Sequence, residues 1–271
     1  MTELLNIFPR LSTSLIDLLD GLSRQQWENE TICSQWTVKD IAAHLLDRVL
    51  RRISAGRDTN ILNGPDLKTY PELPAYLNEL NADWVKAYQR VSPQIIINQL
   101  RHAYDELYTY LKSLDPDAPA IFPVSWAGEE HSTNRFDIER EYTEQWYYQQ
   151  QIRLAVGAPS ILNPELYHPF LQICMKALPY HYLCMDAREG SVVRIEIVGD
   201  AGGVWCIQQL SGSWCFADSA DQADSMVFID QNISWMLFSK AIDINQAAQF
   251  WQVIGNKQLG AHALSMRTFM V

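Results

Sequence analysis

The sequence predicts a two-domain α+β protein, with a helical first domain over residues 1–157 and a smaller α+β domain over residues 160–271. Three observations support this. Apolar residues recur at spacings of three and four through about the first 155 residues, which is typical of amphipathic helices. After Gly190 the pattern changes to short β-branched and aromatic runs separated by glycine-containing turns, as in a small sheet. A chain of 271 residues also usually divides into two domains.

The first domain is expected to be an all-helical bundle. Thr37 is a good N-cap for its second helix, Gly56 a natural end for that helix, and Gly157 a stop for the last one. Pro9 lies inside the first helix and is expected to bend it. The expected helices cover residues 4–22, 37–56, 73–90, 93–114 and 133–156, with loops over 57–71 and 115–132.

The second domain is expected to open with a helical stretch over residues 164–187, broken near Pro179. A meander of neighbouring strands follows, because short β-branched or aromatic runs alternate with turns. The expected strands cover residues 192–198, 204–210, 213–217 and 225–229. Helices are then expected near residues 235–241, 246–251 and 259–270.

The composition excludes several classes of protein. A net charge of −11 argues against nucleic acid or an anionic membrane as partner, since both require a basic surface. No stretch reaches the roughly 18 apolar residues of a membrane span, and the N-terminus lacks the basic and apolar regions of a signal peptide. The five cysteines are odd in number and widely spaced, which does not support a disulfide framework. We therefore expect a cytoplasmic protein.

The first candidate site residue is His44, in the stretch from Trp36 to Asp47. Asp40 is placed three residues after the Thr37 cap, where a carboxylate can reach back to the cap amide. His44 lies one helical turn beyond Asp40 and outside the edge of the apolar stripe, so we expect a boundary position. Such a histidine can be a metal ligand, a base, or simply the partner of Asp40.

The second candidate site lies on the last helix of the bundle. Glu141, Glu144 and Tyr148 follow one another at i, i+3 and i+7 and therefore line one side of that helix. Two carboxylates one turn apart can form half of a metal site or an acid–base pair. The alternative is a solvated acidic strip balanced by Arg140 and Arg153.

The stretch Cys33–Leu45, taken with Glu141–Trp146, resembles the mycothiol-dependent maleylpyruvate isomerase family. That family belongs to the metal-binding DinB-like four-helix bundles. The resemblance extends into the second half, where Gly202–Trp205 and Ile254–Gly260 resemble the sterol-carrier-like C-terminal domain of the family.

The resemblance implies a divalent metal, usually zinc, held by His44, by Glu144 and by a second histidine at the position of Tyr148. This chain has tyrosine there. A phenol with an ordinary pKa near 10 must first lose a proton to bind zinc, whereas a neutral imidazole need not. We therefore expect zinc to be weakly held or absent unless Glu141, Tyr148 or His102 completes the ligand set.

The resemblance also implies a function. A metal near His44 and Glu144 would lower the pKa of a low-molecular-weight thiol, for isomerisation or S-transfer on a small-molecule substrate. The alternative is a non-catalytic relative that binds a small apolar ligand or a protein partner. The sequence assigns no catalytic residue, substrate or oligomeric state.

Overall fold

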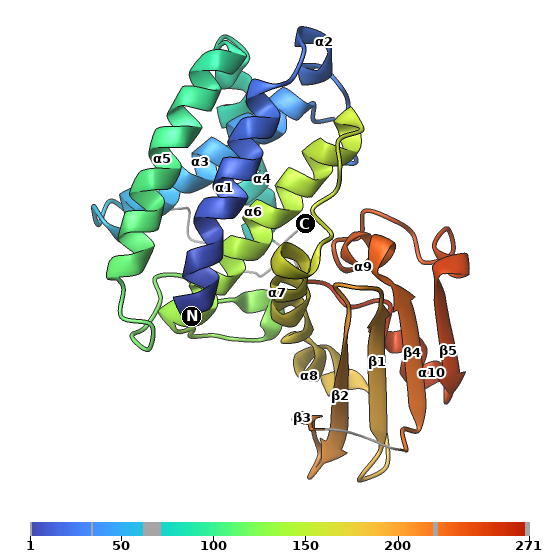
Figure 1. Ribbon diagram of the computed structural model, residues 1–271. Helices are drawn as coiled ribbons and strands as arrows, with labels where there is room; N and C mark the ends of the chain where they lie inside the picture. The colour runs from blue at the N-terminus through green and yellow to red at the C-terminus, as the bar shows by residue number, and fades with distance from the viewer. Residues whose placement is uncertain (1, 34, 62–71, 219–221, 269–271) are drawn as a thin grey trace. The chain divides into compact units, whose positions relative to one another are not determined.

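The computed structural model describes residues 2–33, 35–61, 72–218 and 222–268. The chain forms two compact units, one made of Met1–Pro123 with His131–Ser160 and the other of Val124–Glu130 with Ile161–Val271. The first unit is helical and the second contains a five-stranded sheet with helices (Figure 1). The predicted α+β fold class is confirmed.

The first unit is built from long helices that pack side by side. Its helices are α1 (Thr2–Asp20), α2 (Arg24–Trp27), α3 (Val38–Gly56), α4 (Glu72–Tyr88), α5 (Pro93–Ser113) and α6 (Asn134–Val156). Helix α3 packs against α4, α5 and α6, and α1 packs against α5 and α6. The five expected helices are present, and the short α2 was not predicted. Most of the predicted loop over 57–71 lies outside the described residues.

Local chemistry sets the ends of the two helices that carry the site. Thr37 and Asp40 form a capping box at the start of α3, in which each side chain accepts a hydrogen bond from the other's backbone N–H. At the start of α6, the Thr133 side chain accepts from the N–H of Phe136. Helix α6 ends at Gly157, whose φ of 67° is left-handed and therefore favours glycine.

The second unit begins with α7 (Pro164–Met175), α8 (Leu178–His181) and a 3-10 turn, Tyr182–Cys184. Its strands are β1 (Val192–Val198), β2 (Gly203–Leu210), β3 (Ser213–Ala217), β4 (Ser225–Asp230) and β5 (Trp251–Gly255), in the order β3-β2-β1-β4-β5. The meander prediction is wrong for β4, which pairs in parallel with β1. The alternate residues Val193, Ile195 and Ile197 of β1 are fully buried, as a central strand requires.

The end of the chain also differs from the prediction. A helix over 246–251 is wrong, because the described chain forms only a 3-10 turn at Ala248–Phe250 and then enters β5, antiparallel to β4. Val253 of β5 is buried, so this short run contributes to the sheet core. Helix α9 covers Gln231–Phe238 and α10 covers Lys257–Ala263, each beginning earlier than expected.

The predicted loop 115–132 is divided between the two units. Its middle part, Val124–Glu130, belongs to the second unit and contains a 3-10 turn at Ser125–Ala127. Gly128, with a φ of 82°, lies so close to the ring of Tyr180 that an added Cβ would overlap it. All five cysteines are free thiols. Within the described part of the chain, no helix has the length and apolarity needed to cross a membrane.

Candidate functional site

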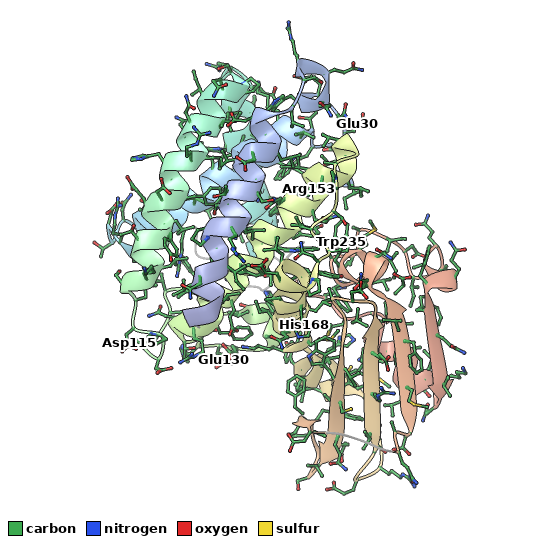
Figure 2. The ribbon with its side chains drawn as sticks, in the orientation of Figure 1. Glu30, Asp115, Glu130, Arg153, His168 and Trp235 are labelled. Carbon is green, nitrogen blue, oxygen red and sulfur yellow. The ribbon has the colours of Figure 1, made fainter. Side chains whose placement is uncertain are left out.

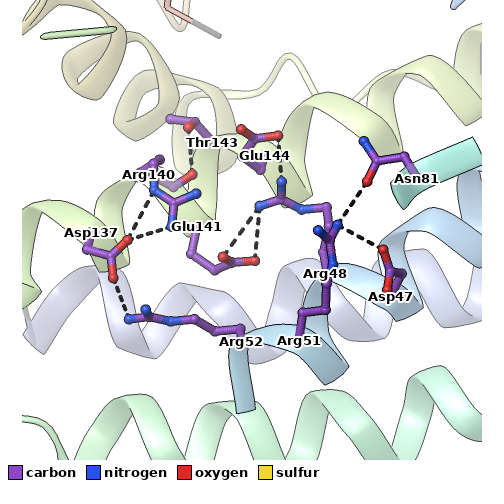
Figure 3. A network of polar contacts seen from close by, with 10 residues as sticks. All are labelled: Asp47, Arg48, Arg51, Arg52, Asn81, Asp137, Arg140, Glu141, Thr143 and Glu144. Atoms are coloured by element: carbon purple, nitrogen blue, oxygen red, sulfur yellow. Dashed lines mark hydrogen bonds and ion pairs between the residues drawn. The ribbon is translucent and has the colours of Figure 1, made fainter. Parts of the chain in front are cut away.

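The candidate site lies where α3 and α6 face each other. Residues four apart on α3 contact α6 residues in the reverse order, so the two helices run in opposite directions here. We call this set of contacts the α3–α6 ladder. Its rungs are His44 with Tyr148, Arg48 with Glu144 and Glu141, and Arg52 with Asp137. Figure 3 shows the charged rungs.

His44 lies at the first rung and is only 2% exposed. Its ring packs against Trp36, with ring centroids 4.9 Å apart, and against Tyr148, at 4.7 Å. The prediction of a boundary position for His44 is wrong, because α6 covers the side of α3 that the apolar stripe leaves open. Neither ring nitrogen has a hydrogen-bond partner among the described residues.

The imidazole of His44 is neutral at physiological pH. Burial, together with the nearby guanidinium groups of Arg48 and Arg51, holds the pKa of His44 well below its usual value of 6.5. A neutral imidazole has one free lone pair, which can accept a proton or bind a metal.

Asp40 is not the partner of His44. One oxygen of Asp40 accepts hydrogen bonds from the N–H and hydroxyl of Thr37, at 2.9 and 2.8 Å, and the other accepts from the Gln89 amide at 2.6 Å. The interpretation of His44 as a histidine paired with Asp40 is therefore wrong for this structure. The Asp40 carboxylate instead caps the start of α3 and accepts a hydrogen bond from the Gln89 side chain.

Arg48 is the central ladder residue that the sequence analysis missed, as it missed Arg52 and Asp137. Its guanidinium lies 3.0 Å from an oxygen of Glu144 and 3.4 Å from one of Glu141, and its side chain is 14% exposed. Burial alone would lower the pKa of Arg48, but the two carboxylates raise it above the usual value. The available signal was the position of Arg48 one turn after His44 on α3.

The two glutamates do not form a solvated acidic strip. Glu141 is 5% exposed, and Arg48 is paired with both carboxylates. Burial alone would raise the pKa of Glu141, but the guanidinium groups of Arg48, Arg140 and Arg52 together hold it below the usual value. Glu141 is therefore ionised and its charge is balanced within the ladder.

Tyr148 is a protonated phenol facing His44. Loss of hydration, and then the negative charge of Glu144, raise the pKa of Tyr148 well above 10. Tyr148 and Glu144 are four residues apart on α6, just as His44 and Arg48 are on α3. The ladder thus places His44 and Glu144 on facing helices, on neighbouring rungs.

The remaining rung extends the charge network along the helices. Arg52 is 2.5 Å from Asp137, and Asp137 also contacts Arg140 at 2.5 Å (Figure 3). On the side of α3 that faces α4, Arg51 pairs with Asp47 at 2.8 Å and donates to Asn81 of α4 at 2.9 Å. His102, the predicted substitute ligand, is instead 80% exposed on α5 and pairs with Glu106.

A separate groove of about 640 Å³ lies along α1 and the end of α6. It is lined by residues such as Arg10, Ser14, Asp17 and Arg153, and not by the predicted site residues. Arg153, labelled in Figure 2, donates to the backbone carbonyls of Ser14 and Pro159.

Residues 8–153 match the family model described as the mycothiol maleylpyruvate isomerase N-terminal domain. The chain belongs to this family. Among solved structures, it is similar to a crystal structure of the mycothiol-dependent maleylpyruvate isomerase carrying a histidine-to-alanine mutation, with a TM-score of 0.55 and 11% identity, over 92% of this chain and 90% of that one. A second crystal structure of the mycothiol-dependent maleylpyruvate isomerase has a TM-score of 0.54 and 10% identity, over 86% of each chain. At this identity the likeness shows a shared fold. No curated protein matches the sequence.

The metal implied by the maleylpyruvate isomerase resemblance does not fit the residues as they lie. Among the described residues, no group of three or more His, Cys, Asp or Glu side chains is placed to hold a metal ion. Glu144 is already paired with the Arg48 guanidinium, and Tyr148 is a phenol that resists deprotonation. Of the three positions, His44 is the one whose ring nitrogens lack a hydrogen-bond partner among the described residues, so one of them could bind a metal.

Proposed function

We propose that this maleylpyruvate isomerase-like protein acts on a small molecule with a low-molecular-weight thiol, as an isomerase or S-transferase, and that His44 accepts the proton of the thiol. The observation that carries the proposal is the neutral, buried imidazole of His44, whose ring nitrogens have no partner among the described residues. A group with that protonation state can act as a general base.

In this proposal the thiol S–H transfers its proton to the free nitrogen of His44, and the thiolate attacks an electron-poor carbon of the substrate. For isomerisation the C–S bond forms at a double bond, the resulting single bond rotates, and the C–S bond breaks to return the thiolate. The thiolate then recovers its proton from His44. In S-transfer the C–S bond is retained and a leaving group departs with the proton.

Proton transfer to His44 requires electrostatic help. An ordinary thiol has a pKa near 8.5, and burial holds the pKa of His44 well below its usual value, so the proton transfer is unfavourable by itself. Arg48 lies one turn away, and its positive charge disfavours imidazolium but favours a thiolate beside it. In the proposed reaction Arg48, still paired with the glutamates, donates one of its N–H groups to the thiolate and so offsets part of the cost.

The test is an isomerase assay with maleylpyruvate and a panel of low-molecular-weight thiols that includes mycothiol, with and without a strong chelator. We expect thiol-dependent turnover that the chelator does not change. His44→Gln should lower it by about 100-fold or more, since general base catalysis typically contributes that much. His102→Gln, at an exposed histidine, is the matched control. Turnover unaffected by His44→Gln would contradict the proposal.

A second candidate is a non-catalytic relative that binds a small apolar ligand or a protein partner. It is supported by the pairing of Arg48 with both glutamates and by Tyr148 at the position of the second family histidine. Calorimetric binding of a thiol or substrate without any turnover would favour this candidate over the enzyme.

A further inference from the structure

The resemblance implies a metal at Glu144. In this chain the guanidinium of Arg48 lies there instead, paired with the two glutamates. Arg48 contacts both Glu144 and Glu141, and it comes from the same helix as His44, one turn along. The positive charge that satisfies these carboxylates is thus covalently attached to the chain.

We infer that Arg48 is a built-in replacement for a divalent cation: its guanidinium neutralises Glu141 and Glu144 and excludes metal, and its removal would free both glutamates to turn toward His44 and hold a divalent cation with it. The inference concerns metal binding only and holds whether or not the protein uses a thiol.

The charge balance of the ladder supports the exclusion of metal. Its three carboxylates, on Asp137, Glu141 and Glu144, are matched by three guanidinium groups, on Arg48, Arg52 and Arg140, so their formal charges cancel. A divalent cation added to this balanced, buried network would leave two uncompensated positive charges, and burying unpaired charge is costly. Without Arg48 the same network has a net negative charge that attracts a cation.

The chemistry of the freed groups specifies the class of metal. His44 has ring nitrogens without hydrogen-bond partners among the described residues, so a ring nitrogen is available to bind a metal. The two glutamates, once released from Arg48, would supply carboxylate oxygens. One imidazole nitrogen with carboxylate oxygens is a donor set that suits zinc and similar first-row divalent ions. As they lie in the structure, the three side chains do not form a metal site, so binding requires the freed glutamate side chains to re-orient while the helix backbones stay in place.

The experiment compares zinc affinity in the wild-type chain, Arg48→Met and Arg51→Met, all expressed without a histidine tag. Methionine keeps the unbranched stem and the helix propensity of arginine while removing its charge. Arg51→Met is the matched control, because Arg51 is on the same helix but pairs with Asp47. Arg48→Lys keeps a positive charge at the glutamates and should behave as the wild type.

We expect Arg48→Met to bind zinc at least 100-fold more tightly than the wild type, a difference of about 2.8 kcal/mol. Arg51→Met and Arg48→Lys should stay within a few-fold of the wild type. Adding His44→Ala or Glu144→Gln to Arg48→Met should abolish the gain. Equal zinc affinity in the wild type and Arg48→Met, or a gain that survives His44→Ala, would overturn the inference.

One further measurement keeps the test decisive. If Arg48→Met is unfolded alone, circular dichroism during a zinc titration should show metal-dependent folding, and a chain that stays unfolded at millimolar zinc would count against the site. Zinc affinity is measured without thiol or substrate. A failure of the thiol assay therefore leaves this result unchanged, and the two failures are distinguishable.

Discussion

Replacing Asp137 with asparagine tests how strongly the α3–α6 ladder stabilises the first unit. The Asp137 carboxylate is fully buried and contacts Arg52 and Arg140, each at 2.5 Å. Asparagine keeps the shape of the side chain and removes its charge. Arg52, whose side chain is 4% exposed, would then lose the carboxylate that balances its guanidinium.

The expected cost follows from the burial of Arg52. Breaking a buried ion pair by removing one partner costs about 3 to 5 kcal/mol, because the other charge stays buried without compensation. The asparagine carbonyl can still accept one hydrogen bond, which recovers about 1 kcal/mol. We therefore expect the free energy of unfolding to fall by roughly 2 to 4 kcal/mol, which corresponds to a melting temperature lower by roughly 5 to 15 °C.

Urea unfolding followed by tryptophan fluorescence and far-UV circular dichroism measures this change. Arg57→Met is the control, since Arg57 pairs with Asp58 and Glu106 at a surface position with 45% of its side chain exposed. Water screens an exposed ion pair, so this variant should change the stability little. The double variant Arg52→Met with Asp137→Leu should recover part of the loss, because an apolar pair has no charge to compensate. If Asp137→Asn unfolds at the same urea concentration as Arg57→Met, the reasoning about the buried ladder is wrong.

His44→Gln should flatten the pH dependence of stability between about pH 6.5 and 5, and His102→Gln, at an exposed site, should not. Burial, with Arg48 and Arg51 nearby, lowers the folded-state pKa of His44, so below about pH 6.5 the unfolded chain takes up a proton that the folded chain does not. The wild-type free energy of unfolding therefore falls as the pH falls, with His44 contributing up to about 1.4 kcal/mol per pH unit. Urea unfolding that gives the wild type and His44→Gln the same dependence on pH would count against this. Tyr148→His alone should raise zinc affinity less than ten-fold in a calorimetric titration, because Glu144 is still ion-paired with Arg48. A hundred-fold rise would show that Arg48 does not prevent zinc binding. Gly202→Ala should destabilise the second unit by about 1 to 3 kcal/mol, since an added Cβ would overlap the carbonyl oxygen of Ile197, and an unchanged thermal melt would refute the overlap.

The sequence was sufficient for features that depend on neighbours along the chain. Thr37 with Asp40 specifies the start of α3, and Gly157 specifies the end of α6, because capping bonds and left-handed glycines act within a few residues. The alternation in β1 predicted its bounds, Val192–Val198, since each strand has one buried face. The motif around His44 was enough to indicate the family that the match over residues 8–153 establishes.

Strand partners needed the tertiary structure. The strand pattern of β4 was visible, but its pairing with β1 rather than β3 depends on which strand becomes central, a property of the whole sheet. The run from Trp251 to Gly255 is short, and periodicity over so few residues cannot separate a strand from a helix. Its antiparallel backbone pairing with β4 makes it a strand.

The contacts and protonation of the candidate site residues also depend on the tertiary structure. Helical spacing puts His44 and Arg48 on one side of α3, and Glu144 and Tyr148 on one side of α6, but it carries no information on how the two helices align. The antiparallel alignment brings Tyr148 to His44 and Arg48 to Glu144. Burial then removes water from these groups, so that the imidazole stays neutral and the carboxylates take a guanidinium as their counter-charge. Residue types along the chain determine which charges are available, and packing of the helices determines which of them meet.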